Sequence, residues 1–402
     1  MTPPAADLVV LAYSGGLDTT VTVHRMVHEQ GRAVVALLAD VGQGEDLPAL
    51  AQRALAAGAA DAVVVDARDR FAAEFLVPAV RANALYEGRY PLVSALSRPL
   101  IAQPLVEEAR RRGAAAVAHG CTGKGNDQVR FEVSCGALAP ELEILAPVRD
   151  SAMSRPEAIA YADKHGLDLG GITGDKPYSV DQNLWGRTIE AGVLEDPWRQ
   201  PPEDAFEWTV SPATASGTRE IVVSFEAGVP AAVDGDEVGL AGVVATLNRA
   251  GGEAGFGRVD MMENRRVGIK SREVYEVPGA LAVIAAHRDL EDLTLDRDVL
   301  HEKARLDIRY AELVYDGLWF SPLKSALDAF VAETQAAVTG EVRLELSPGR
   351  CQPTGRRAER ALYRPDLATY ESGDAFDHDA GRGFVALWGL PARTWARVHR
   401  DG

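Results

Sequence analysis

The first hydrophobic run of the chain, residues 8–12, has the sequence LVVLA and carries no alternating polar side. A Ser-Gly-Gly turn then interrupts the run, and a mixed segment begins near Thr20. A continuous apolar run of this length is typical of a strand buried on both faces of a parallel sheet. The pattern therefore predicts a buried strand, a loop and a helix at the start of the chain.

Strands and helices of the same kind alternate as far as residue 148. The predicted helices are 20–30, 47–57, 71–85 and 104–112, and the predicted strands are 33–41, 62–65, 115–119 and 143–148. Strands separated by helices are joined by right-handed crossovers, and ligands of such sheets gather at the carboxyl ends of the strands. The fold class predicted for residues 1–170 is therefore α/β, a doubly wound parallel sheet.

The pattern changes from about residue 171, where glycines and prolines become frequent. Antiparallel strands are predicted in 219–233, and helices in 240–250, 278–287, 296–318 and 321–338. We therefore expect a second, α+β domain over residues 171–364. Residues 365–402 are irregular up to a short helix near 391–398. Their Trp388 and Trp395 predict a terminal arm that packs either on a partner subunit or back on its own domain.

The composition of the chain limits the kinds of partner that we expect for the protein. The 402 residues suffice for two or more domains, and 42 Lys and Arg against 59 Asp and Glu give a formal net charge of −17. This surplus of negative charge argues against nucleic acid or an anionic membrane as the main partner. The three cysteines lack C-x-x-C spacing, which argues against a disulfide framework or a structural zinc site. No uncharged run approaches the length of a membrane span, so we expect a soluble, cytoplasmic protein.

The turn after the first strand is the first candidate site. Gly15 and Gly16 let the backbone approach a ligand closely, and the loop N–H groups with the following helix N-terminus favour a bound anion. Hydroxyl groups are added by Ser14, Thr19 and Thr20. Since short motifs also match by chance, a tight turn without a ligand is the alternative interpretation.

Asp18 is the unexpected member of this turn, because a carboxylate repels a phosphate unless a cation such as Mg²⁺ lies between them. The alternative is that Asp18 is the helix N-cap. A Walker A loop is excluded because Lys124 is followed by Gly125 rather than by Ser or Thr, and no G-x-G-x-x-G follows the first strand. The stretch SGGLDTT instead resembles the pyrophosphate loop of the ATP pyrophosphatases, which implies that residues 14–20 hold pyrophosphate.

A second glycine-rich turn, residues 119–130, follows the fourth predicted strand. Donors and acceptors of both signs are supplied by Thr122, Lys124, Asn126, Asp127 and Arg130. Such a mixture suits a ligand that has both an ammonium and a carboxylate group, namely an amino acid. The alternative is an Asn-Asp turn with the arginine in an ion pair.

Five stretches taken together extend the resemblance. They are SGGLDTT, YEGRYPLVSALSRP from Tyr86, HGCTGKGNDQVRFE from His119, KPYSVDQNLWGR from Lys176 and MMENRRVGIKSREVYE from Met261. In this order and spacing they resemble the argininosuccinate synthases. Five independent matches are far more specific than any single one, although the resemblance fades after about residue 342.

The resemblance implies an adenine nucleotide alpha hydrolase-like sheet, ATP and Mg²⁺ as cofactors, and a homotetramer. It implies that ATP and citrulline give a citrullyl-adenylate and pyrophosphate, and that the aspartate amine then displaces AMP. ATP would contact Ala12, Tyr13, Ser14, Gly15, Gly16, Leu17, Asp18, Thr19, Thr20, Ala39 and Gly120. Aspartate would contact Thr122, Asn126 and Asp127. Citrulline would contact Tyr90, Asn126, Arg130, Ser179, Thr188, Glu263 and Tyr275.

This chain departs from the family pattern at three positions. Thr20 and Thr188 stand where the family usually has serine, which keeps the hydroxyl and adds a methyl group. Ala95 stands where some members have serine, so that side-chain contact is missing here.

The residues suit this chemistry. The ureido oxygen of citrulline is a poor nucleophile, so catalysis depends mainly on placing it in line with the α-phosphate. Lys124, the loop N–H groups and Mg²⁺ can stabilise charge on the phosphates. Arg130 can bind an α-carboxylate in bidentate fashion, and Glu263 can pair with an α-ammonium. Asp127, the other candidate catalytic residue beside Lys124, either accepts a proton from the aspartate amine or only orients it.

Other interpretations stay open at this point. Glu263 can belong to a solvated charge cluster, and Tyr275 can be a cross-strand packing residue. Among enzymes, an amidotransferase-type synthetase or a tRNA thiolase could use the same loop, but the first needs an extra domain and the second favours a basic surface and paired reactive cysteines. A non-catalytic nucleotide-binding module on the same layout is the alternative outside enzymes.

Overall fold

The computed structural model describes residues 7–151, 153–169, 178–371 and 373–400. The boundary expected near 170 and the first two residues of the KPYSVDQNLWGR stretch lie outside these residues. The chain separates into two compact units, residues 1–359 and 360–402, which are described in turn.

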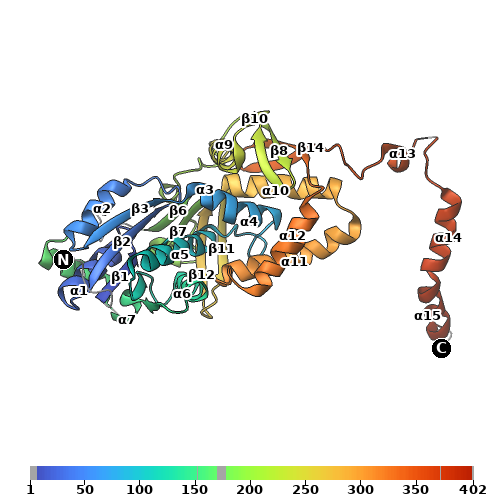
Figure 1. The fold of residues 1–402 in the computed structure, drawn as a ribbon. Helices are drawn as coiled ribbons and strands as arrows, with labels where there is room; N and C mark the ends of the chain where they lie inside the picture. The colour runs from blue at the N-terminus through green and yellow to red at the C-terminus, as the bar shows by residue number, and fades with distance from the viewer. Residues whose placement is uncertain (1–6, 152, 170–177, 372, 401–402) are drawn as a thin grey trace. The chain divides into compact units, whose positions relative to one another are not determined.

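A five-stranded sheet forms the first half of the larger unit (Figure 1). Its strands lie in the order β3-β2-β1-β4-β5, and all neighbouring strands are parallel. They are β1 (Leu8–Ala12), β2 (Ala33–Asp40), β3 (Asp61–Asp66), β4 (Ala116–His119) and β5 (Glu143–Leu145). The strand order reverses between β1 and β4, so the predicted α/β fold is confirmed with its topological switch point there.

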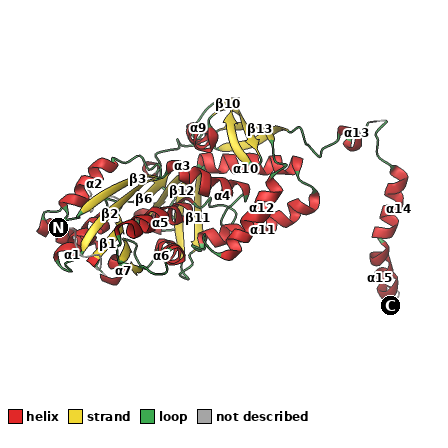
Figure 2. Ribbon diagram, viewed as in Figure 1, coloured by secondary structure: helices red, strands yellow, loops and turns green. Residues whose placement is uncertain are grey.

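Helices cover both faces of this sheet (Figure 2). Val9 and Leu11 of β1 pack with α1 (Leu17–His28) and α2 (Leu47–Ala56). Leu8 and Val10 pack on the other face with α5 (Val93–Arg112) and α6 (Asp127–Leu138). Because both faces of β1 are buried, the strand has no polar alternation, as its sequence predicts.

The first helix begins earlier than expected. α1 starts at Leu17, and its N-cap is Gly16, which has extended backbone angles and no side-chain capping bond. Asp18 lies inside the first helical turn, so the interpretation of Asp18 as N-cap is wrong. A carboxylate in the first turn still interacts favourably with the helix dipole.

The helix predicted to begin at residue 104 is much longer. α5 runs over Val93–Arg112, with Pro99 and Pro104 inside it and both buried. Proline usually ends a helix because it lacks an N–H and clashes with the preceding turn. Here burial against the sheet and the second half of the unit outweighs that cost, which local sequence does not reveal.

The helix predicted over 71–85 is irregular and shorter. After α3 (Arg68–Arg70) comes a π-helix, η2 (Phe71–Leu76), then α4 (Val77–Arg81) with Pro78 in its first turn. Proline cannot donate to the helical ladder, and the turn before it is widened to π geometry. This segment joins the core of the second half, where Phe75 stacks on Trp319 with 4.6 Å between ring centroids.

The remaining elements of the first half also differ from prediction. The strand predicted to residue 148 ends at Leu145, because Pro147 begins α7 (Pro147–Ser151). Besides the short α3 and α7, the helices α6 and α8 (Arg155–His165) have no counterpart among the predicted helices.

Among the described residues, two antiparallel sheets and four longer helices form the second half. The predicted strands in 219–233 are confirmed. The helices predicted at 240–250 and 278–287 are longer in the structure, and those predicted at 296–318 and 321–338 are shorter. The first sheet has the order β11-β12-β7-β6, with β6 (Ser179–Asn183), β7 (Gly186–Glu190), β11 (Arg258–Asn264) and β12 (Lys270–Glu276). The second has the order β10-β9-β8-β13-β14, with β8 (Arg219–Glu226), β9 (Val229–Val233), β10 (Asp236–Glu237), β13 (Gly340–Ser347) and β14 (Arg350–Arg357). The helices are α9 (Gly239–Glu253), α10 (Pro278–Thr294), α11 (Arg297–Tyr315) and α12 (Pro322–Gln335), and short 3₁₀ turns lie at Gly192–Glu195 and Glu203–Ala205.

The smaller unit consists of α13 (Pro365–Ala368), α14 (His378–Trp388) and α15 (Leu390–Arg400). Among its described residues none is buried, and Trp388 and Trp395 are 78% and 61% exposed.

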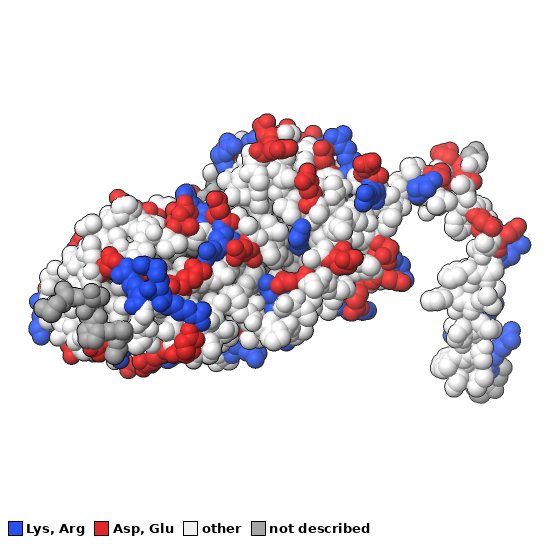
Figure 3. Space-filling model, in the orientation of Figure 1, with Lys and Arg blue, Asp and Glu red and all other residues white. Residues whose placement is uncertain are grey.

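Acidic and basic side chains are interspersed over the face shown in Figure 3. Among the described residues, no helix is both long and apolar enough for a bilayer span.

The glycine at the start of β7 generates a stability prediction. A Cβ on Gly186 would meet Val277 Cγ1 and lie 2.9 Å from Val93 Cγ2, so it would press α5 and the end of β12 apart. Gly186→Ala should lower the free energy of unfolding by about 1–3 kcal/mol, measured by urea denaturation. Gly136→Ala inside α6 is the matched control, because its Cβ would meet only Ile144 Cδ1 at 3.9 Å. That change should raise stability by about 0.5–1 kcal/mol, and equal effects would contradict the packing argument.

Candidate active site

The two glycine-rich turns lie side by side at the switch point. β1 and β4 are neighbouring parallel strands, with Ala12 paired to His119. A Cβ on Gly120 would lie only 2.6 Å from Thr19 Cγ2, so the turn after β4 rests against the first turn of α1. The residues predicted to hold ATP are thereby placed next to those predicted to hold an amino acid.

The first turn requires glycine. Gly15 has φ +73°, its Cβ would lie 2.6 Å from Leu50 Cδ2, and its carbonyl accepts a hydrogen bond from Arg53 Nη1 at 2.8 Å. The sharp turn exposes Ser14 above the N-terminus of α1. The turn leads directly into the N-terminus of α1, whose first N–H groups and helix dipole favour an anion.

The hydroxyl groups of this turn are not equivalent. Ser14 Oγ and Thr19 Oγ1 lie 3.2 Å apart near the surface. Thr20 is fully buried, and its Oγ1 lies 2.9 Å from the Tyr13 hydroxyl. All three hydroxyls expected to contact phosphate therefore lie within hydrogen-bonding distance of another protein group, and Thr20 is the most deeply buried of the three residues.

Asp18 and Ala39 lie on either side of the turn. Asp18 extends from the first turn of α1 and is exposed, and partial desolvation by its neighbours raises the pKa of its carboxyl while Arg155 acts in the opposite direction. Ala39 lies near the end of β2, and its carbonyl accepts a hydrogen bond from Gln43 Nε2 at 2.9 Å. Its small side chain is only partly buried.

The second turn is held by the β11–β12 hairpin. Arg266 donates its backbone N–H to Asn126 Oδ1 at 3.0 Å, and Arg265 Nη1 donates to the Lys124 carbonyl at 3.3 Å. Arg265 is anchored in turn by Glu190 at 2.8 Å and by Glu273. The side chains of Thr122 and Lys124 remain exposed.

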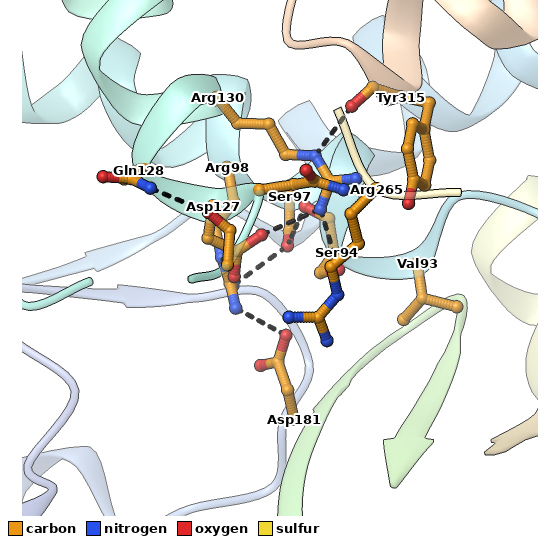
Figure 4. A network of polar contacts seen from close by, with 12 residues as sticks. Val93, Ser94, Ser97, Arg98, Asp127, Gln128, Arg130, Asp181, Arg265 and Tyr315 are labelled. Carbon is orange, nitrogen blue, oxygen red and sulfur yellow. Dashed lines mark hydrogen bonds and ion pairs between the residues drawn. The ribbon is translucent and has the colours of Figure 1, made fainter. Parts of the chain in front are cut away.

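Asp127, the first residue of α6, is shared by two arginines (Figure 4). Its Oδ2 accepts from Arg98 Nε at 2.9 Å, and its Oδ1 accepts from Arg130 Nη1 at 2.8 Å. Arg98 Nη2 also donates to Asp181 Oδ2 on β6 at 2.6 Å. Burial alone would raise the pKa of Asp127, but the two guanidinium groups outweigh it and lower the pKa to about 2. A carboxylate with this pKa is ionised at neutral pH and is a weak base.

Glu263 lies in a pocket of tyrosines and is only 3% exposed. It accepts hydrogen bonds from the hydroxyls of Tyr275 and, at 2.8 Å, Tyr315. Burial raises the pKa of Glu263, and the two tyrosine hydroxyls oppose that shift. The interpretation of Glu263 as part of a solvated charge cluster is therefore wrong. Tyr275 does pack, stacking on Tyr90 at 4.4 Å between ring centroids, but it also donates to Glu263.

Arg130 is buried, and two of its nitrogens already have protein partners. Besides the bond from Nη1 to Asp127, Nε donates to the Tyr315 carbonyl at 3.1 Å. The guanidinium also lies over the Tyr315 ring at 4.9 Å from its centroid. Arg130 therefore cannot offer two free nitrogens to a ligand carboxylate. Among the hydrogen bonds of the described residues, Nη2 is the guanidinium nitrogen without a protein partner.

Thr188 and Ser179 lie on the sheet that faces these arginines. Thr188 of β7 is paired with Asp181 on one side and Tyr275 on the other. Among the described residues, nothing hydrogen-bonds to its buried Oγ1. A buried hydroxyl without a partner is costly, so a ligand atom at this position would stabilise it. Ser179 begins β6 and is exposed.

The sequence interpretation missed several residues of this region. Arg98 and Ser94 lie in the quoted YEGRYPLVSALSRP stretch, where a polar side chain inside a buried helix was the available signal. Ser94 Oγ lies 3.1 Å from the Tyr90 hydroxyl. Tyr315 ends an ordinary amphipathic helix, and its local pattern gives no such signal.

The chain is similar to proteins of one family over nearly its whole length. Residues 8–168 match the family model described as Arginosuccinate synthase N-terminal HUP domain, and residues 178–395 match Arginosuccinate synthase C-terminal domain. An argininosuccinate synthase of Rubrobacter xylanophilus is 57% identical over 98% of this chain and 96% of its own length. Those of Bacillus pumilus and Bacillus licheniformis are each 55% identical over 98% of this chain and 97% of their own length.

Among solved structures, a U34-tRNA thiolase from Methanococcus maripaludis covers 43% of this chain and 61% of its own, with a TM-score of 0.29 and 12% identity. So weak a likeness carries no functional argument. The family models together span both halves of the larger unit, and the relatives match over nearly the whole chain. The chain therefore belongs to the argininosuccinate synthase family and is an ATP-dependent ligase of citrulline and aspartate.

Proposed function

We propose that the ligation takes place between the turns after β1 and β4, with the antiparallel sheet β11-β12-β7-β6 closing the amino-acid side. The reaction releases AMP and pyrophosphate by way of a citrullyl-adenylate. The observation that carries this assignment is the contact of Gly120 with Thr19, which puts the nucleotide turn beside the amino-acid turn. In this assignment the N–H groups of residues 14–20 hold pyrophosphate as it leaves.

Citrulline lies along the face of the antiparallel sheet. Glu263 pairs with its α-ammonium and Arg130 Nη2 pairs with its α-carboxylate. Both side chains are buried, and each carries the charge opposite to that of the citrulline group it binds. Tyr90 and Tyr275 form an apolar wall along the side chain. Thr188 Oγ1, Ser179 and Asn126 supply the remaining polar contacts, and the unpartnered Thr188 hydroxyl supports this placement most directly.

Aspartate lies at the N-terminus of α6, with Thr122, Asn126 and Asp127. The low pKa of Asp127 and its two arginine partners support an orienting role rather than proton removal. Lys124 is exposed at the same turn and is free to reach a phosphate oxygen, where it would stabilise developing charge.

Mg²⁺ fits this site as a partner of the phosphates. Among the described residues, no group of three or more His, Cys, Asp or Glu is placed to hold a metal ion, so phosphate oxygens would supply most ligands. Asp18 is the carboxylate beside the anion turn, and it would hold the ion against the pyrophosphate. The ion would neutralise phosphate charge when bound.

Product analysis tests the reaction. With ATP, citrulline and aspartate, the protein should form AMP, pyrophosphate and argininosuccinate in equal amounts, and omission of aspartate should leave only adenylate formation. Production of ADP and phosphate, or turnover independent of citrulline, would contradict the proposal.

Asp18→Asn should raise the Mg²⁺ concentration needed for half-maximal activity about tenfold, because the negative charge that attracts the ion is lost. Thermal unfolding should change little, since Asp18 makes no capping bond. Initial rates over a magnesium titration measure the effect. A large drop in the unfolding midpoint with an unchanged magnesium requirement would instead show that Asp18 stabilises the helix.

We further propose a cytoplasmic homotetramer. The unpaired Cys121, Cys135 and Cys351 suit a reducing compartment. Exposed apolar side chains of α14 and α15, including Phe384, Trp388 and Trp395, support contact with other subunits.

Light scattering coupled to gel filtration should give the mass of four chains for the protein and a smaller assembly after removal of residues 365–402. A tetramer that persists without this segment would contradict its role in assembly.

A further inference from the structure

Tyr315, the last residue of α11, contacts both groups that we assign to the ends of the citrulline amino acid. Its hydroxyl donates to Glu263 Oε2 at 2.8 Å, and its carbonyl accepts from Arg130 Nε at 3.1 Å. Its ring lies beneath the Arg130 guanidinium at 4.9 Å. One residue thus touches the proposed ammonium-binding carboxylate and the proposed carboxylate-binding guanidinium, by three separate interactions.

The surroundings hold Tyr315 in place. Its ring stacks on Tyr86 at 3.5 Å between centroids with an interplanar angle of 5°, and the Tyr86 hydroxyl donates to the Asn264 carbonyl at 2.7 Å. Directly after the helix, Gly317 has φ +78°, and its Cβ would lie 2.9 Å from Arg130 Cα. Only a glycine lets the end of α11 approach the first turn of α6 so closely.

Tyr315 is one of two tyrosines that hold Glu263, and the two are not equivalent. Tyr275 comes from the neighbouring strand β12 and also stacks on Tyr90, which is part of the proposed citrulline wall. Tyr315 comes from a helix far along the chain and couples Glu263 to Arg130. A side chain that contacts both charged groups constrains their spacing and orientation.

We propose that Tyr315 is a positioning residue for citrulline, which sets the spacing and orientation of Glu263 and Arg130 without being required for the chemical step. The inference rests on the proposed assignment of Glu263 and Arg130 to citrulline.

The charged and titratable groups around Glu263 define what loss of the hydroxyl does. They are Tyr275, Tyr315, Arg130 and Arg265, together with the carboxylate Glu273 and the hydroxyls of Tyr86 and Tyr90. Burial raises the pKa of Glu263, and the Tyr315 hydroxyl is one of the contacts that oppose the shift. Without this hydroxyl the pKa of Glu263 rises further. As the pH is lowered, Glu263 of the variant is therefore protonated earlier than in the wild type, and it can then no longer pair with an ammonium group.

The test is Tyr315→Phe in the full chain, which keeps the ring and its stacking. The KM for citrulline should rise roughly tenfold, whereas kcat and the KM values for ATP and aspartate should stay within about twofold. The citrulline KM of the variant should increase further as the pH is lowered. The citrulline KM of the wild type should show the same increase, but beginning at a lower pH.

Tyr310→Phe is the matched control on the same helix. Tyr310 is also buried and donates to a carboxylate, Asp328, at 3.0 Å, but it does not contact the site. It should leave the citrulline KM unchanged. Because KM does not depend on how much of the enzyme is folded, a partial loss of folded protein leaves this comparison intact.

Coupling to Glu263 gives the second measurement. If Tyr315 acts through this carboxylate, Tyr315→Phe should add little to the citrulline KM of Glu263→Gln. Equal effects of Tyr315→Phe in both backgrounds would overturn the inference, as would an unchanged citrulline KM or a rise of equal size for Tyr310→Phe. A rise confined to the aspartate KM would overturn the inference and the citrulline assignment together.

Discussion

Pairing of two largely buried arginines with two partly exposed carboxylates, where two different sheets meet, is the constraint on which the site depends. Asp127 is shared by Arg98 and Arg130, and Arg98 continues the link to Asp181 on the antiparallel sheet. A charge removed from water costs several kcal/mol unless opposite charge and hydrogen bonds replace the lost solvation. Loss of one member would leave another charge buried without its partner. The cluster therefore fixes the distance from the turn after β4 to the sheet face that carries Thr188.

The parallel sheet decides where this cluster can lie. Strand order reverses between β1 and β4, so their two connections diverge and leave a space at the carboxyl edge. Gly15 makes the sharp exit from β1, and Gly120 lets the second turn lie against Thr19. Helix N-termini from both connections point toward this edge, and their partial positive charge suits a leaving pyrophosphate and an amino-acid carboxylate.

The crossover from β3 to β4 ties the nucleotide half to the amino-acid half. Instead of covering only its own sheet, it sends Phe75 and Asn83 into the second core. Asn83 donates there to Glu291 at 2.7 Å and to Asp307 at 3.0 Å, beside the buried Lys303. If the two halves separated, Asn83 would lose its hydrogen bonds to Glu291 and Asp307. The two substrate regions are therefore held in a defined relative position by contacts between the two halves.

Local patterns in the sequence predict the first strand at residues 8–12, the turn and helix that follow it, the parallel class of the first sheet and the motif residues, because apolar runs and glycine turns are local signals. The start of α5 at Val93 despite Pro99, the bridge from Arg98 to two acidic residues and the contact of Tyr315 with Glu263 are visible only in the folded chain. These features join residues far apart along the chain. Their stability comes from burial and from pairing in space, and no local periodicity records which distant residue supplies the partner.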